Sequence, residues 1–198
     1  MGAAMLNFIP GTRVADVHLN RMAALLFATS YLQYCSFANK LRLPLVELQR
    51  RQNIDPYLGQ LHAMFDAAHN FTGFFTAATL DEFAQVPARS HYRDEMREMD
   101  AAYDDFVVRH AQDGDFLVAS LAIEERFRGA GLFKAMLAEI ERQARSRGSA
   151  RMVLTVWERS DAMPIYQAKG FRSCGTFDYA WELFFDRLHF MACDLERT

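Results

Sequence analysis

The stretch from Asp115 to Gly148 constrains the fold more than any other part of the chain. Its first part, residues 116–123, is a short apolar run that only Ser120 interrupts. A run of this length suits a strand that is covered on both faces. From Gly131 onward the apolar residues recur at three- and four-residue steps, which is the period of a helix with one buried face. The stretch therefore predicts a buried strand, a tight turn and a helix that ends near Gly148.

The turn between this strand and this helix, residues 128–131, has the sequence Arg-Gly-Ala-Gly. Glycine lets the backbone approach a ligand closely because it has no Cβ. A helix that begins at such a turn directs unpaired N–H groups and a partial positive charge at whatever lies in front of it, and a phosphate group suits that place. Arg126 and Arg128 add forked cationic donors. A plain turn with no ligand fits the same residues, so both interpretations stay open at this point.

Size and composition favour one compact unit. The chain has 198 residues, which fits one domain or one domain with an elaboration. Seventeen Phe and ten Met indicate an apolar interior, and some of these side chains could also line an apolar pocket or a subunit contact. The formal net charge of -3 gives no general attraction to nucleic acid, so we expect no nucleic-acid partner.

Cysteine usage and the apolar runs bear on the compartment. The three cysteines are widely spaced, with no CxxC pair, which favours a reducing environment. The first thirteen residues, MGAAMLNFIPGTR, show no basic-then-apolar signal. No apolar run approaches the ~20 residues that cross a bilayer. We therefore expect a cytoplasmic protein with no membrane partner.

The first half of the chain shows three strand patterns, at residues 6–9, 61–65 and 71–78. Residues 66–70 between the last two favour turns, so these two strands should form an antiparallel hairpin.

Helical patterns lie between the first and second of these strands. Thr12 is expected to cap a long helix that extends into an aromatic segment, and residues 45–52 are expected to form another short helix. The aromatic side chains are either core residues or part of a substrate pocket; they are Tyr31, Tyr34 and Phe37.

The second half continues after the organising stretch. Residues 151–157 predict a second buried strand, parallel to the first because a helix joins them. Residues 172–177 and 188–195 predict two closing strands, with residues 181–186 in the connection between them. Before the organising stretch, residues 92–108 predict a charged helix with an apolar stripe.

The turn and its flanks resemble the acyl-CoA-binding core of the GNAT N-acetyltransferases, in the acyl-CoA N-acyltransferase superfamily. The motif of that family is Arg/Gln-x-x-Gly-x-Gly/Ala after an apolar strand, and Arg126, Gly129 and Gly131 occupy its three fixed places. Two neighbours depart from the commonest pattern, because Ala130 stands where a basic residue is frequent and Phe133 where a small one is frequent.

A second motif of the family, Asn-x-x-Ala-x-x-Leu-Tyr followed by Gly-Phe, resembles residues 159–171. Ala162, Tyr166 and the Gly170-Phe171 pair match, and Ile165 is a close substitute for the Leu. Arg159 replaces the Asn, which puts the usual contact of that residue in doubt. The two motifs occur in the family's order, with a helix and a strand of suitable length between them.

The resemblance implies an α/β (α+β) fold, with a mixed six- to seven-stranded sheet flanked by helices and splayed at the fourth and fifth strands. It covers residues 115–195 well and residues 6–78 loosely. We expect a single domain over 1–198. Within it, residues 1–80 would build the acceptor side, 81–111 a helical elaboration and 115–195 the acetyl-CoA-binding core. The elaboration would lie beside the acceptor cleft or act as a lid, or would be a solvated amphipathic helix.

The resemblance also implies site residues. Backbone groups of the fourth strand would bind the pantetheine arm of acetyl-CoA, and N–H groups of the turn would bind its pyrophosphate. The implied cofactor-binding residues are Leu121, Ala122, Ile123, Arg126, Arg128, Gly129, Ala130, Gly131, Leu132 and Phe133. Tyr166 would protonate the departing thiolate, and its alternative role is that of a packed aromatic.

The general base stays open among three carboxylates near the strand ends, which are Glu124, Glu125 and Glu158. Each of them is also an ordinary candidate for a solvated surface side chain. The six histidines show no metal spacing and there is no GxGxxG pattern, so we expect no metal and no nucleotide beyond CoA.

The function that the resemblance implies is acetyl-CoA-dependent N-acetylation of a small-molecule amine. Two alternatives stay open. One is a non-catalytic acyl-CoA-binding or sensor module of the same fold, and the other is an acyltransferase that uses a longer acyl-CoA. A homodimer is among the oligomeric states that the resemblance implies.

Overall fold

The computed structural model describes residues 6–30, 41–86, 93–178 and 186–195. Over these residues, one seven-stranded sheet has the order β1-β2-β3-β4-β5-β7-β6. The strands are β1 (Asn7–Pro10), β2 (Leu61–Phe65), β3 (Phe71–Thr79), β4 (Phe116–Ile123), β5 (Arg151–Trp157), β6 (Arg172–Asp178) and β7 (Arg187–Asp194). Neighbouring strands are antiparallel except β4 and β5, which are parallel. The predicted mixed sheet is thereby confirmed.

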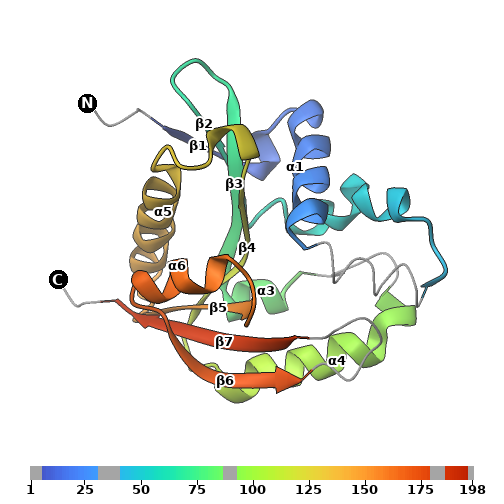
Figure 1. Cartoon of the computed structure of the whole chain (residues 1–198), viewed down its shortest axis with the longest axis vertical. Helices are drawn as coiled ribbons and strands as arrows, with labels where there is room; N and C mark the ends of the chain where they lie inside the picture. The colour runs from blue at the N-terminus through green and yellow to red at the C-terminus, as the bar shows by residue number, and fades with distance from the viewer. Residues whose placement is uncertain (1–5, 31–40, 87–92, 179–185, 196–198) are drawn as a thin grey trace.

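Helices cover both faces of this sheet (Figure 1). The helices are α1 (Asp16–Thr29), α3 (Leu80–Ala84), α4 (Arg93–His110), α5 (Leu132–Ser146) and α6 (Ala162–Ala168). On one face, α5 and α6 pack on the sheet through Met136, Ile140 and Met163. On the other face, α1, α3 and α4 contribute Phe27, Phe83 and Phe106 to a second core cluster.

Some expectations for the first half of the chain are wrong in detail. Thr12 does not cap the long helix, because it lies in a 3-10 turn at Gly11–Arg13 and α1 begins only after Ala15. Residues 45–52 form two 3-10 turns, Leu45–Gln49 and Arg51–Asn53, instead of one helix. The aromatic segment with Tyr31, Tyr34 and Phe37 lies outside the described residues.

One end of the β4–β5 pair is held by a buried ion pair. Asp115, directly before β4, is 2% exposed, and Arg151 is the first residue of β5. The guanidinium donates from Nε to Oδ1 at 2.8 Å and from Nη2 to Oδ2 at 2.6 Å. The same Nη2 donates to the carbonyl of His110 at 3.2 Å, so the pair also holds the end of α4. Two parallel hydrogen bonds fix the relative position of both strands at this end.

The other end of the pair is open. The β4–β5 register ends at Val118 and Leu154, although β4 continues to Ile123 and β5 to Trp157. At the same place the β3–β4 register skips Ala119, which is a β-bulge. A bulge bends its strand and increases the local twist, so β4 turns away from β5 here. Figure 1 shows β4 and β5 running in clearly different directions beyond this point.

Past the bulge, each strand follows its other neighbour. The end of β4 stays on β3, where Gly73 is paired with Ile123. A Cβ on Gly73 would lie 2.4 Å from the carbonyl oxygen of Ala122, so only glycine allows this approach. The end of β5 stays on β7, where Trp157 is paired with Leu188. The splay that the sequence predicted is therefore confirmed, and both of its edges are held in place.

The helix α4 is held on the sheet by one apolar face. Phe106 is 2% exposed and stacks on Phe177 of β6, with ring centroids 5.1 Å apart. His110 lies so close to Gly175 that a Cβ there would come within 2.2 Å of its ring. The opposite face carries exposed residues such as Asp105 and Arg109. Since its apolar face is buried, α4 is part of the folded core and not a helix surrounded by solvent.

The ion pair at the closed end of the splay yields a stability prediction. We expect Asp115→Asn to lower the free energy of unfolding by about 3–5 kcal/mol, because it leaves the guanidinium of Arg151 buried without its charge partner. Chemical denaturation measures this change. The matched control is Arg172→Met, which breaks an ion pair to Asp194 whose side chains are 76% and 68% exposed; it should cost only about 0–1 kcal/mol. Equal losses in the two variants would contradict the prediction.

Candidate active site

A single cavity of about 1400 Å³ occupies the open end of the splay. Most of the residues that line it, apart from those on the strands of the sheet, fall into two sets, which we name by the nearest long helix. The α5 side consists of residues 121–123, 127–129, 131–133, 160–162, 165 and 166. The α4 side consists of residues 26, 28–30, 53, 54, 57, 80, 81, 83, 84, 100, 103, 104, 107 and 108.

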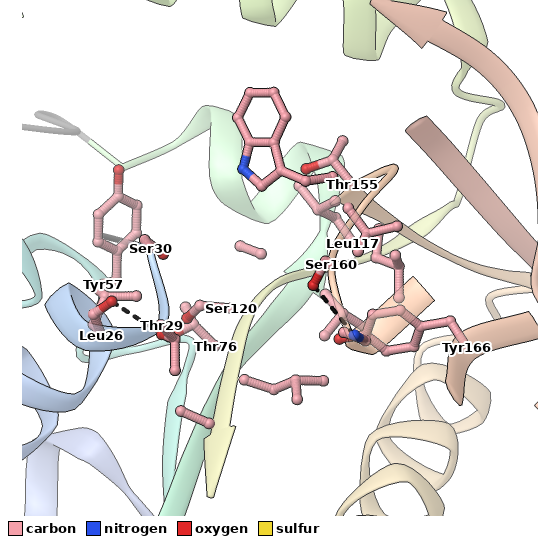
Figure 2. A pocket seen from close by; sticks show the side chains of 18 of the residues that line it. Leu26, Thr29, Ser30, Tyr57, Thr76, Leu117, Ser120, Thr155, Ser160 and Tyr166 are labelled. Atoms are coloured by element: carbon pink, nitrogen blue, oxygen red, sulfur yellow. Dashed lines mark hydrogen bonds between the residues drawn. The ribbon is translucent and has the colours of Figure 1, made fainter. Parts of the chain in front are cut away.

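The cavity connects the two faces of the sheet. Leu154 and Val156 pack with the helix α5, whereas Leu117 and Leu188 pack with the helices of the opposite face. All four residues line the same cavity. Figure 2 shows this arrangement, with Tyr57 and Thr29 on one side of the space and Ser160 and Tyr166 on the other. A molecule on the α5 side could therefore meet a second molecule that arrives from the α4 side.

The turn before α5 has the conformation that an anion site requires. Gly129 and Gly131 have φ angles of 78° and 77°, a region that residues with a side chain rarely adopt. Gly131 is also the N-cap of α5, and it has no side chain that could accept from the first turn of the helix. The helix start lies at the cavity, because Gly129, Gly131 and Leu132 line it, and its first N–H groups have no side-chain cap. This explains physically why the sequence has glycine at both positions.

The structure brings together most of the predicted cofactor-binding residues. Eight of the ten line the α5 side of the cavity: Leu121, Ala122, Ile123, Arg128, Gly129, Gly131, Leu132 and Phe133. Arg128 also donates from Nε to the carbonyl of Ile123 at 3.2 Å, which ties the turn to the end of β4. Arg126 and Ala130 are exposed and do not line this cavity.

Arg126 instead belongs to a charged cluster behind the turn. Glu124, directly after β4, is 7% exposed, and its carboxylate forms an ion pair with Arg21 of α1. Arg126 donates from Nε to the same carboxylate at 3.1 Å, and its guanidinium lies 4.6 Å from the ring centre of Phe127. The expectation of a solvated surface carboxylate is therefore wrong for Glu124. Its oxygens are occupied by two guanidinium groups, so it suits a structural role better than that of a proton acceptor.

The other two carboxylates considered as bases are exposed. Glu125 lies on the surface beside Glu124, and the side chain of Glu158 is 48% exposed at the end of β5. Neither lines the cavity. Arg159 lies next to Glu158 and donates its backbone N–H to Asp186 at 2.9 Å, away from the cavity lining.

Tyr166 lies in the second half of the short helix α6 and is 8% exposed. Its ring packs against Phe171, with centroids 5.7 Å apart, and against Phe133 at 6.1 Å. Burial raises the pKa of its phenol to about 12. Figure 2 shows the ring extending toward the cavity beside Ser160. Tyr166 is thus both a packed aromatic and a cavity-lining phenol that keeps its proton at neutral pH.

Phe133 has a contact that explains its departure from the commonest pattern. It is the second residue of α5, and its ring supports one face of Tyr166. A small residue at this place would leave that face uncovered. Phe133, in place of a small residue, therefore gives the phenol of Tyr166 an aromatic neighbour. It leaves the backbone N–H groups of the helix start unchanged.

The sequence offered a place beside the acceptor cleft for the helix of residues 92–108, but it did not identify the contacts on the α4 side. Tyr103 of α4 and Thr155 of β5 share a hydrogen bond of 3.1 Å between their hydroxyl oxygens. Both residues line the cavity, as do Tyr57 and Trp157. These residues come from segments up to 100 positions apart, and no local pattern connects them. In the sequence, only the apolar stripe of residues 92–108 indicated that a helix packs here, because it predicted one buried face.

Two searches of the described residues concern other kinds of site. No group of three or more His, Cys, Asp or Glu side chains is arranged to hold a metal ion in the part of the chain that the structure describes. In the same ranges, no helix combines the length and the apolar character needed to cross a membrane.

Comparisons with known proteins place the chain in a family. The family model of the acetyltransferase (GNAT) domain matches residues 76–180, which is more than half of the chain. The chain belongs to the GNAT acetyltransferase family. The match includes the turn before α5, the splayed strands and Tyr166, so the predicted family is confirmed. A search of curated proteins finds no match for this GNAT protein.

Solved structures with the same fold are numerous and distant in sequence. The C-terminal condensation domain of Ebony, solved in complex with beta-alanyl-dopamine, has a TM-score of 0.69 at 11% identity, over 98% of this chain and 100% of its own. Ard1 from Thermoplasma volcanium has a TM-score of 0.58 at 12% identity, covering 97% and 99%. IAA acetyltransferase from Bacillus cereus has a TM-score of 0.56 at 13% identity, covering 98% and 100%. These likenesses confirm the fold of the GNAT protein.

The charged cluster behind the turn yields a second stability prediction. We expect Glu124→Gln to lower the free energy of unfolding by about 2 kcal/mol, because the amide loses the charge that both guanidinium groups bind. For a chain of this size this is a decrease in Tm of about 4–8 °C. The neighbouring exposed Glu125→Gln is the matched control and should change Tm by less than about 2 °C. The prediction fails if thermal unfolding shows the same Tm for both variants.

The buried phenol yields a prediction for alkaline pH. Since the pKa of Tyr166 is raised to about 12 by burial, its phenol stays protonated through pH 10, where exposed tyrosines ionise. The folded state keeps this proton to a higher pH than the unfolded state does. The free energy of unfolding should therefore fall as pH rises from about 10 to 12.

A tyrosine Cζ label observed by NMR measures this ionisation. The resonance that disappears in Tyr166→Phe should show no ionisation shift up to pH 11 in the wild type. A midpoint near pH 10 for that resonance would show that the phenol is solvated.

Proposed function

We propose that this GNAT protein is an acetyl-CoA-dependent N-acetyltransferase that acetylates the amine of a small molecule. One observation supports this most directly: a single cavity joins the turn before α5, the unpaired edge at the splay and the phenol of Tyr166, and then continues to the opposite face of the sheet. The cosubstrate and the acceptor could thus approach the same point from two sides.

The residues of the α5 side fit a phosphorylated thiol carrier. N–H groups of the turn, with its two glycines of positive φ, suit the pyrophosphate, and Arg128 adds a cation on the same side. Past Val118 the β5-facing edge of β4 is no longer part of the β4–β5 ladder. Backbone groups of Leu121, Ala122 and Ile123 could therefore bind the amides of a pantetheine arm as a neighbouring strand would. We assign the eight cavity-lining residues of the predicted set to acetyl-CoA; Arg126 and Ala130, which lie outside the lining, stay predictions.

Acetyl-CoA would supply the acyl group as a thioester. The deprotonated amine attacks the carbonyl carbon, so that a C–N bond forms, and the C–S bond then breaks with its electron pair on sulfur. An N–H group near the splay would stabilise the oxyanion in between. Tyr166 would donate a hydrogen bond or its proton to the departing sulfur. Since the pKa of this phenol is raised, it is protonated in every molecule at neutral pH, as a donor to the leaving group must be.

The three glutamates considered as the base are poorly placed to accept the amine proton. Glu124 is held by two guanidinium groups, and Glu125 and Glu158 lie outside the cavity lining. We propose that water in the open cavity removes this proton. A homodimer and a cytoplasmic location stay predictions.

Exchange of Tyr166 tests the mechanism. We expect Tyr166→Phe to lower kcat by about 10²-fold, because the leaving thiolate loses its donor. The affinity for CoA, measured by calorimetry, should stay within about twofold, because the backbone groups and Arg128 are unchanged. Glu125→Gln is the control, because Glu125 is exposed and lies outside the cavity lining, and it should leave kcat within about threefold.

The assay is release of free thiol from acetyl-CoA in the presence of a library of amines. CoA binding without thiol release for any amine would favour the non-catalytic binding module. Faster thiol release from a longer acyl-CoA than from acetyl-CoA would favour an acyltransferase that uses a longer acyl group. An unchanged kcat in Tyr166→Phe would remove the phenol from the mechanism.

A further inference from the structure

Aromatic side chains from four different elements line the cavity, three of them on its α4 side. Tyr57 ends the 3-10 turn Asp55–Tyr57, Phe83 lies in α3, Tyr103 in α4, and Trp157 ends β5. All four line the cavity, and the rings of Tyr57 and Phe83 are in edge contact at 6.3 Å. Figure 2 shows Tyr57 across the open space from Thr155 and Tyr166. Aromatic walls of this kind suit a flat ring more than a flexible polar chain.

The helix α4 is held in a position where it can form a wall of this space. Phe106 anchors it on β6, and the Asp115–Arg151 pair binds the carbonyl at its last residue. Between the anchored end and the start of the helix, the hydroxyl of Tyr103 is bonded to Thr155 at 3.1 Å. Thr155 belongs to the part of β5 that has separated from β4. The ring of Tyr103 is therefore fixed at the splay itself, beside the place where the acyl group would be transferred.

The charged residues are unevenly distributed between the two sides of the cavity. Three carboxylates line the α4 side, which are Asp81 of α3 and Asp100 and Asp104 of α4. On the α5 side, among the lining residues that the structure describes, there is one guanidinium, Arg128, and one exposed carboxylate, Asp161. The α4 side therefore carries more acidic residues, and two of them, Asp100 and Asp104, also have partners within the protein.

We propose that the acceptor is a small aromatic amine, whose ring lies between Tyr57, Tyr103 and Trp157. Its amino group points to the splay between Ser120 and Thr155. This inference rests on the proposed N-acetyltransferase function and adds the class of its acceptor. It makes Tyr103 a specificity-determining residue and α4 the wall of the acceptor site.

Two amines of equal length and charge separate the ring from other properties of the acceptor. 2-Phenylethylamine and 2-cyclohexylethylamine are both primary ammonium ions at neutral pH and differ in the aromatic character of the ring. In the wild type, kcat/KM should be about tenfold or more higher for the phenyl compound, because only that ring has the electron distribution that pairs with aromatic walls. Calorimetric titration of each amine into the protein with CoA present gives the same comparison without turnover.

Variants of α4 locate the preference. Tyr103→Leu should lower the phenyl-to-cyclohexyl ratio to about one to threefold, whereas Tyr103→Phe keeps the ring and most of the ratio.

Each combination of outcomes decides between the two proposals. Transfer with the phenyl preference supports both. Transfer to amines with no preference, or a preference that Tyr103→Leu leaves unchanged, overturns the acceptor class and keeps the enzyme. Preferential binding of the phenyl compound without any thiol release keeps the acceptor site and overturns the enzyme. If the protein shows no binding preference and no transfer, both proposals are overturned.

Discussion

The end of the hydrogen-bonded pairing between β4 and β5 is the feature on which the rest of the site depends. The two strands are fixed together at Asp115 and Arg151 and are separated past Val118 and Leu154. The bulge at Ala119 supplies the bend. Because the strands stay paired to their outer neighbours, the opening is a fixed wedge. Without the wedge the sheet would be a continuous wall, and the turn before α5 would have no connection to the opposite face.

The two sides of the wedge differ in the kind of ligand that they favour. The α5 side presents backbone N–H groups at a helix start, which favour an anion. The α4 side presents aromatic rings, which suit the flat apolar part of the proposed acceptor. Tyr166 lies between them, buried against Phe133 and Phe171. Burial of this phenol raises its pKa, and so the same packing that positions the ring also keeps it protonated.

The core of the fold could be predicted from the sequence because its signals are local. The apolar run at 116–123, the two glycines and the helical period that follows each depend on neighbouring residues, and so the strand, turn and helix were predicted close to their observed bounds. The second motif placed Tyr166 beside the same strands. Since the family determines how these elements pair, the splay could also be expected.

The remaining features could not be predicted because they depend on contacts between distant segments. Glu124 looks like a surface carboxylate in the sequence, and its burial results from Arg21, which lies 103 positions earlier. Tyr103 meets Thr155 only because α4 folds back against β6 and β7. Thr12 was a plausible helix cap by residue type, but the chain makes a 3-10 turn there first. For Glu124 and Tyr103 a long-range contact decided the outcome, and for Thr12 a local turn did.

Hydrogen exchange with and without CoA tests the central claim most directly. If the free edge of β4 binds the pantetheine arm, backbone amides in residues 119–133 should exchange more slowly when CoA is present. Amides of β7, which is paired on both sides, should be unaffected. Protection confined to β7 or elsewhere, or no protection in residues 119–133 at saturating CoA, would contradict the account.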